Sequence, residues 1–348
     1  MKLSTKYIPM GALPYENIDA TVRMAAKLFD KIPYLPMLPK ISEEETITNI
    51  TLQNLPGVKI KDKKITLKVA STNYKNGLTK LDKAFNNPVR DNLEVFKIES
   101  AFMEKYFQMI KKFKPEVAII NLLGPFTISQ ILMTVAEEQM LVDKSFRKLF
   151  IQSVCVKALW AIDKIKNSNP DTKPLIILEE PLLGRLGDIK RENEEITIDL
   201  VTSLFARVIE KIKEHDAYVG VHCQGKCDWK IPINAGVDLI SFDAFNNPNN
   251  LCIIPEQIIE FVSRGGKINW GIVPTEPESL VKSINAEYVL KRLLATMEGL
   301  VVAGVPEKFV YNSALVSVQG STEKLPLIFA EKALILSTQI AKQIPHKS

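Results

Sequence analysis

The sequence Ala217-Tyr218-Val219-Gly220-Val221-His222-Cys223-Gln224-Gly225-Lys226-Cys227-Asp228-Trp229 joins a short apolar run to a cluster of metal-ligating residue types. Residues 217–221 have the composition of a buried strand. They lead into one of only three histidines and two of only four cysteines in the chain. Such residues at the carboxyl end of a strand are a common active-site arrangement in α/β proteins. The stretch therefore predicts a strand that ends in a functional site.

Apolar runs of this kind recur along the chain and alternate with helical patterns. Their composition, apolar on both faces with helical crossovers between them, predicts a parallel sheet. Strands are predicted at 7–11, 32–39, 117–120, 174–178, 217–222, 237–242, 267–272 and 309–311. Helices are predicted near 17–31, 125–140, 144–167, 197–214, 228–235, 255–264, 286–303 and 323–342. Eight strands with intervening helices predict a (β/α)8 TIM barrel.

One further segment does not fit this alternation. Residues 58–70 alternate polar and apolar side chains around Lys61-Asp62-Lys63-Lys64, which predicts a β-hairpin inserted after the second strand. The 348 residues contain no internal repeat or clear linker, so a single domain over 1–348 is expected.

Composition narrows the class of protein. The chain is 46% hydrophobic and 24% charged, and its net charge of +5 comes from dispersed lysines, which favours a solvated surface over nucleic-acid binding. No apolar run approaches the length of a membrane span, and the first residues lack the apolar core of a signal peptide. Four cysteines in a chain this long do not predict a disulfide framework, so a cytoplasmic location is expected.

In a barrel of this type, chemistry takes place on the loops that follow the strands, and a small-molecule substrate is the expected partner there. This rule selects seven segments: 11–14, 121–127, 179–181, 222–229, residue 243, 271–275 and 312–321.

These segments resemble the superfamily of cobalamin-independent methionine synthase and uroporphyrinogen decarboxylase. The closer similarity is to short, single-barrel proteins like the catalytic half of methionine synthase. The matching motifs occur in the family's order across nearly the whole chain. They are Met10-Gly11-Ala12-Leu13-Pro14, Leu38-Pro39-Lys40, Gly124-Pro125-Phe126-Thr127, Glu179-Glu180-Pro181, His222-Cys223 with Asp228-Trp229, Ser241-Phe242-Asp243-Ala244 and Trp270-Gly271-Ile272-Val273-Pro274-Thr275.

The resemblance implies a methyltransferase that moves a methyl group from a folate or a corrinoid carrier, with a corrinoid protein as a partner, to an acceptor. The family holds zinc through a His-x-Cys pair, a carboxylate and a distant Cys-Gly. In this sequence His222 and Asp243 match the histidine and the carboxylate, whereas Gln224 and Gln319 stand at the two cysteine positions. These four residues are the catalytic candidates.

Zinc binding remains open at the level of sequence. Glutamine is a poor zinc ligand beside thiolates. Cys223 is expected to face the helical layer, because adjacent side chains on a strand point to opposite faces. Cys227 lies beyond the strand, so His222, Asp243 and Cys227 form the alternative metal set.

The resemblance also implies substrate-binding roles for Gly11, Ala12, Glu179, Glu180 and Trp270. The family's Gly-Ser-x-Pro motif carries alanine at residue 12, and its Asp-Glu-Pro motif, whose acid grips the substrate amine, begins with a longer acid at Glu179. These departures predict a changed acceptor.

Structural roles are the alternative for several of these candidates. Glu180 would then receive backbone N–H groups, Asp243 would cap the following loop, and Trp270 would pack in the core.

Two other functions compete with methyl transfer. A metal-free decarboxylase like the porphyrinogen enzyme would use arginines and an aspartate near the first strand, but only Arg23 lies there. A non-catalytic protein that binds a small molecule or a corrinoid partner would explain the loss of both thiolate ligands.

Overall fold

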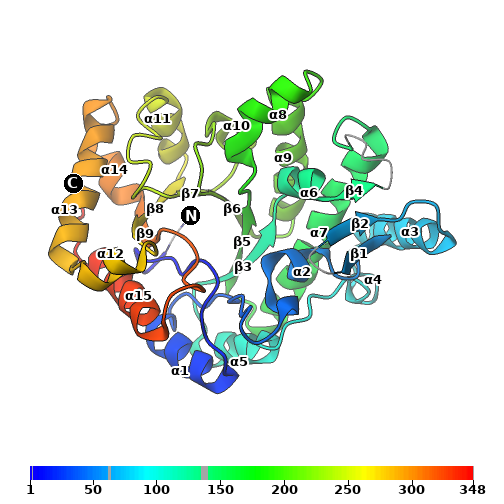
Figure 1. Cartoon of the computed structure of the whole chain (residues 1–348), viewed down its shortest axis with the longest axis horizontal. Helices are drawn as coiled ribbons and strands as arrows, with labels where there is room; N and C mark the ends of the chain where they lie inside the picture. The colour runs from blue at the N-terminus through cyan, green and yellow to red at the C-terminus, as the bar shows by residue number, and fades with distance from the viewer. Residues whose placement is uncertain (2, 62–63, 135–139, 348) are drawn as a thin grey trace.

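A computed structural model describes residues 1, 3–61, 64–134 and 140–347 of the chain. The main sheet has six parallel strands in the order β3-β5-β6-β7-β8-β9. They are β3 (Val117–Leu123), β5 (Lys173–Glu179), β6 (Tyr218–Cys223), β7 (Leu239–Phe242), β8 (Lys267–Val273) and β9 (Ala314–Val318). Figure 1 shows this sheet curling into a half-barrel with helices around its outer side.

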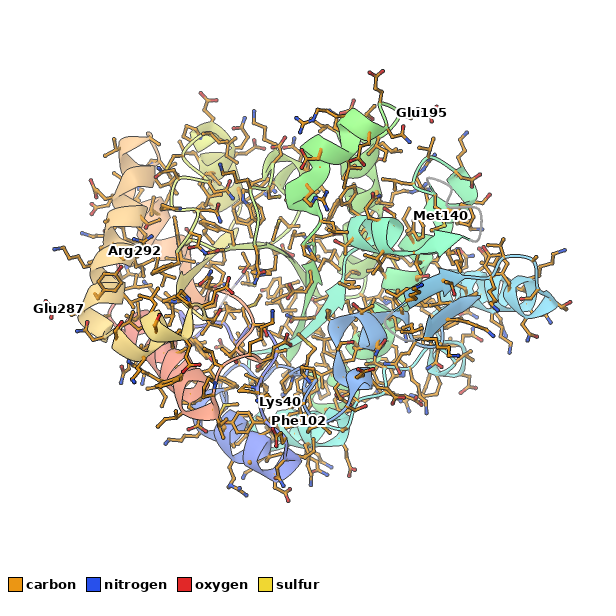
Figure 2. All side chains as sticks on the ribbon, in the orientation of Figure 1. Lys40, Phe102, Met140, Glu195, Glu287 and Arg292 are labelled. Atoms are coloured by element: carbon orange, nitrogen blue, oxygen red, sulfur yellow. The ribbon has the colours of Figure 1, made fainter. Side chains whose placement is uncertain are left out.

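Helices connect the strands and cover the sheet. Helices α1 to α7 are Ile18–Leu28, Ile47–Leu52, Thr72–Asn86, Arg90–Glu94, Met103–Phe113, Pro125–Ile131 and Lys144–Ser168. Helices α8 to α15 are Leu186–Glu192, Ile198–Lys213, Lys230–Asn234, Pro255–Ser263, Glu278–Ser283, Ala286–Val302, Glu307–Ser313 and Leu327–Ala341. Short 3-10 turns lie at Glu43–Glu45 and Leu183–Arg185. Side chains fill the space between the sheet and these helices, so every residue of β3, β7 and β9 is buried (Figure 2).

The expected closed eight-stranded barrel is wrong. Residues 7–11 and 32–39 do not form strands; each contributes a single bridge, Tyr7 to Val316 on β9 and Tyr34 to Ile119 on β3. Their prolines explain this, because each proline lacks the N–H that a strand ladder requires. The two segments instead run along the two edges of the half-barrel, and just after the first of them Leu13 N donates to Met37 O in the second at 3.0 Å.

The expected last strand at 309–311 is also wrong, because these residues belong to α14. Pro306 precedes the first turn of that helix as its N-cap, and β9 follows it directly. A three-residue apolar run cannot distinguish a strand from a buried helix segment.

The inserted hairpin is present. Strands β1 (Val58–Lys61) and β2 (Lys64–Leu67) pair antiparallel, and β2 also pairs in parallel with the short β4 (Met133–Thr134). The helix expected over 125–140 ends earlier, as α6, and residues 135–139 of that prediction lie outside the described part of the chain. Within the described part, no helix combines the length and the apolar character needed to cross a membrane.

Candidate active site

A row of polar side chains runs across four neighbouring strands of the main sheet. Glu179 on β5 pairs in register with His222 on β6, His222 with Ser241 on β7, and Ser241 with Asn269 on β8. Register partners project to the same face of a sheet, so these four side chains lie side by side. We call Glu179, His222, Ser241 and Asn269 the polar row.

Contacts link the members of the polar row one to the next. His222 Nε2 lies 3.9 Å from Glu179 Oε2. On the other side of the ring, His222 Nδ1 lies 2.9 Å from Ser241 Oγ. Asn269 Nδ2 donates to Ser241 Oγ at 2.8 Å and to Ser317 Oγ at 2.9 Å. The row is therefore one connected network.

Ser241 lies between His222 and Asn269 in this network. Asn269 donates its amide hydrogens to Ser241 and Ser317, so the Ser241 hydroxyl accepts one bond. The contact between Ser241 Oγ and His222 Nδ1 places Nε2, the other ring nitrogen, on the side of Glu179. When Ser241 donates to Nδ1, a neutral ring carries its hydrogen on Nε2.

Glu179 has an unusual environment for a carboxylate. Its side chain is 15% exposed, and Asn121 Nδ2 donates to its Oε1 at 2.6 Å. Burial raises the pKa of Glu179, while His222 and the Asn121 hydrogen bond partly oppose that rise. A carboxylate in such a site is a stronger base than one in water.

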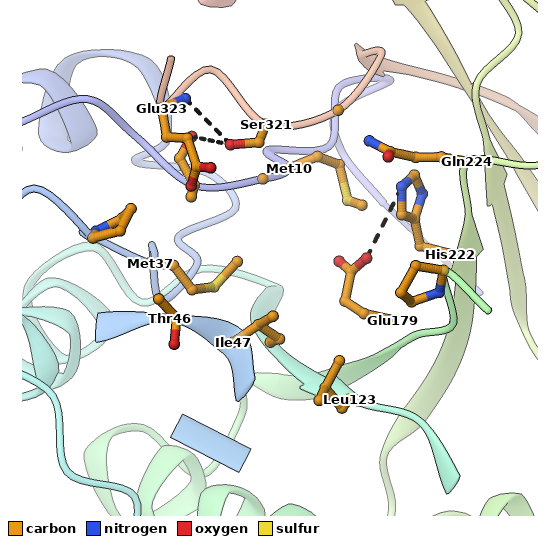
Figure 3. A pocket seen from close by; sticks show the side chains of 15 residues that line it. Met10, Met37, Thr46, Ile47, Leu123, Glu179, His222, Gln224, Ser321 and Glu323 are labelled. Carbon is orange, nitrogen blue, oxygen red and sulfur yellow. Dashed lines mark hydrogen bonds and ion pairs between the residues drawn. The ribbon is translucent and has the colours of Figure 1, made fainter. Parts of the chain in front are cut away.

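A cavity of about 320 Å³ opens above Glu179 and His222. Its walls are mostly apolar, and Figure 3 shows Met10, Met37, Ile47 and Leu123 around the space that Glu179 faces. The remaining lining residues come from the N-terminal segments, the start of α2 and the loops after β5, β6 and β9. They are Gly11, Ala12, Pro39, Thr46, Pro181, Gln224, Gly320, Ser321 and Glu323. A pocket of this size and character fits a small, largely apolar molecule held by a few polar groups.

Asp243 and Gln319 lie together beside this cavity, outside its lining. Gln319 Nε2 donates to Asp243 Oδ2 at 3.1 Å. Asn246 donates from its backbone N–H to Oδ1 and from its side chain to Oδ2, both at 2.9 Å. Both carboxylate oxygens are thus engaged by neutral donors, and Asp243 caps the loop that follows β7.

The residues present do not fit a zinc site. In the described ranges, no three His, Cys, Asp or Glu side chains come close enough to hold a metal ion. Cys227 is buried away from the cavity beside Cys223. Burial raises the pKa of the Cys227 thiol, whereas zinc requires a thiolate. We therefore derive no chemical step through a metal.

Two expected substrate-binding residues lie outside the cavity lining. Glu180 is fully buried and accepts hydrogen bonds from Phe126 N at 3.0 Å and from Thr127 N at 2.8 Å. Burial raises the pKa of Glu180 to about 7, against the opposing effect of these bonds. Trp270 is also fully buried, and because it follows Asn269 on β8 it faces the opposite side of the sheet.

Sequence reasoning did not assign roles to Asn121, Ser241, Asn269 or Ser317. The signal that identifies them is their place in the sheet: Ser241 and Asn269 share a register row with His222, and the others lie one layer away. It also missed the walls supplied by Met37, Thr46 and Ile47, because loop packing brings those residues to the cavity.

No protein-family profile matches the chain, and no curated protein matches it. Among solved structures, the chain is similar to a chitobiase of Flavobacterium johnsoniae, with 10% identity and a TM-score of 0.36. The match covers 98% of this chain and 52% of that one, so the chain spans about half the length of the chitobiase. This likeness is too weak to carry an argument about fold or activity.

Proposed function

We propose that the chain is a methyltransferase that moves a methyl group from a folate or corrinoid carrier to a small acceptor, with Glu179 as the base that deprotonates the acceptor. The observation that carries this proposal is the half-buried Glu179 carboxylate facing His222 Nε2 across 3.9 Å in a mostly apolar cavity. The order of strand-end motifs that resemble the methionine synthase family supplies the reaction class.

The gap between Glu179 and His222 suits a single acceptor atom. An atom lying within hydrogen-bonding distance of both Oε2 and Nε2 fits a 3.9 Å separation. The acceptor donates its proton to Glu179 Oε2, and His222 Nε2 lies on the other side of the acceptor atom. Its freed electron pair forms the new bond to the methyl carbon, and the electron pair of the broken bond stays with the carrier.

Glu179 and His222 would thereby replace zinc as the groups that activate the acceptor, in comparison with the enzymes that the sequence resembles. Zinc activates an acceptor by making it a better nucleophile near neutral pH. A general base in a mostly apolar pocket achieves the same end by removing the proton, at a typical gain of about 10²- to 10⁴-fold. The apolar walls support this role because they disfavour the charged carboxylate and so make it a stronger base.

The test is transfer of a labelled methyl group. The purified protein is given methyl-labelled folate or methyl-labelled corrinoid with pools of thiols, amines and alcohols, and labelled products are identified by mass spectrometry. We expect transfer to one acceptor class, and a loss of about 10²- to 10⁴-fold in Glu179→Gln. Glu287→Gln is the matched control, because Glu287 is an exposed acid on α13 at the edge of the molecule (Figure 2).

Two outcomes count against the proposal. Transfer that is equally fast in Glu179→Gln would remove the base from the mechanism. Binding of a small molecule without any transfer from either carrier would assign the chain a binding role alone.

Four cysteines without a disulfide support a cytoplasmic location for this activity.

A further inference from the structure

The charges that line the cavity are negative or neutral. Among the lining residues, the ionisable side chains are Glu179, His222 and Glu323, and neither lysine nor arginine contributes to the walls. The cavity therefore has no lysine or arginine with which to hold a carboxylate, phosphate or sulfonate.

Among the described residues, Glu179 has no lysine or arginine partner, and its one ion-pair neighbour is His222. The described ion pairs include no lysine or arginine on Glu179, and its one hydrogen bond comes from the neutral amide of Asn121. Burying a carboxylate without a counter-charge is unfavourable. A positive charge brought by the ligand would offset that cost, whereas a negative charge would add to it.

The rest of the cavity limits the size and shape of the ligand. Met10, Met37, Ile47 and Leu123 surround the space, and the volume of about 320 Å³ is at the small end for ligand pockets. Flexible methionine side chains adapt to apolar groups of different shape. In Figure 3, Glu323 lies across the view from Glu179 and His222, so both sides of the space carry an acid.

We infer that the cavity binds a small organic monocation, an amine with a short apolar body, whose ammonium lies on Glu179. The inference rests on the proposed function where it makes this amine the methyl acceptor. An α-amino acid or a polycarboxylate is not expected to bind, because either ligand would bring an unpaired negative charge next to Glu179 or Glu323.

The chemistry of such an acceptor is balanced. The ammonium loses one proton to Glu179 Oε2, and the nitrogen lone pair forms the N–C bond to the methyl group. The bond between the methyl group and its folate or corrinoid carrier breaks, and its electron pair remains on the carrier. The proton then leaves Glu179 to solvent or to the carrier.

A matched ligand series tests the inference by calorimetry on the full chain. The series is n-pentylamine, 1-pentanol, pentanoate and norleucine, which share an unbranched butyl chain and differ in charge. We expect the amine to bind about tenfold or more tightly than each of the other three, a difference of about 1.4 kcal/mol. Glu179→Gln should reduce this preference to less than about threefold, and Glu287→Gln should keep it.

The inference fails if pentanoate or norleucine binds as tightly as the amine, if no amine binds, or if a folded Glu179→Gln variant keeps the preference. The comparison of ligands on the unmodified protein stands even if the variant does not fold. Failure of the proposed function looks different: the amine binds with the expected preference but accepts no methyl group. Conversely, labelled transfer to a carboxylate-bearing thiol would overturn the inference and leave methyl transfer in place.

Discussion

Ser241 contacts Nδ1 of His222 and so leaves Nε2 on the side of Glu179. Its hydroxyl joins His222 Nδ1 to Asn269, and it is completely buried. Ser241 does not line the cavity, so its hydroxyl positions the ring without touching the ligand.

Replacing Ser241 by alanine tests this role. In the wild type, two-bond ¹H–¹⁵N correlations should show His222 with its hydrogen on Nε2. In Ser241→Ala we expect a mixture of tautomers, slower methyl transfer, and a loss of about 1–3 kcal/mol of stability, because the Asn269 amide loses a buried acceptor.

Two variants separate positioning from packing. Ser241→Thr keeps the hydroxyl and should restore the Nε2–H tautomer. Ser337→Ala removes an equally buried hydroxyl, but that hydroxyl only donates within its own helix, to Leu334 O, so a smaller loss of stability is expected. An unchanged His222 spectrum in Ser241→Ala would show that the tautomer is set elsewhere.

At the scale of single elements, Gly124 and Glu180 connect the start of α6 to the end of strand β5 through hydrogen bonds. Glu180 accepts bonds from Phe126 N, Thr127 N and the Thr127 hydroxyl, the last at 2.6 Å. A Cβ on Gly124 would lie 2.0 Å from Glu180 Oε1. The glycine is therefore required by the buried carboxylate beside it.

Gly124→Ala should destabilise the protein by roughly 2–5 kcal/mol, because Glu180 must move away from three buried donors. Denaturant unfolding measures the loss. Gly187→Ala on α8 is the matched control: no heavy atom lies within 4 Å of a Cβ there, and alanine favours a helix, so stability should stay constant or rise. A change below about 0.5 kcal/mol in Gly124→Ala would show that Glu180 relaxes freely.

The elements differ in how well the sequence predicts them. Strands β3, β5, β6 and β8 are apolar on both faces and bounded by turns, so the predicted ranges agree with the structure to within a few residues. The structure of the two edge segments of the half-barrel could not be predicted from local composition in this way. Whether residues 7–11 and 32–39 form strands depends on pairing with distant segments, which their prolines prevent.

In the candidate site, some residues could be predicted from the sequence and others only from the structure. His222 and Glu179 were selected because they end strands, and the structure places both on the cavity. Ser241 and Asn269 required knowledge of the register, which local sequence does not contain. Trp270 was selected by its motif, but alternation along β8 turns it to the side away from Asn269.

At the scale of the whole molecule, stability depends on an apolar core that also encloses a few charged groups. Lys157 on α7 is the clearest case. Its side chain is fully buried, and its Nζ donates to Lys97 O at 3.1 Å. Burial lowers the pKa of Lys157 from 10.5 to about 7, and the distant charge of Glu99 offsets little of this.

This shift predicts how stability changes with pH. Below about pH 7 the amine is protonated in both folded and unfolded chains, so the full cost of burying a cation is present. Between about pH 7 and 10.5 the unfolded chain binds more protons than the folded one, so the free energy of unfolding contributed by Lys157 rises with pH. The slope is at most about 1.4 kcal/mol per pH unit.

Lys157→Met should remove this slope and raise stability at pH 7 by about 1–4 kcal/mol, because methionine fills the site without a charge. The measurement is the difference in unfolding free energy between variant and wild type from pH 6 to 10, in which other titrating groups cancel. Lys111→Met, at an exposed position on α5, should change stability by less than about 0.5 kcal/mol at every pH. A difference between Lys157→Met and wild type that stays constant with pH would mean that the amine keeps an ordinary pKa inside the fold.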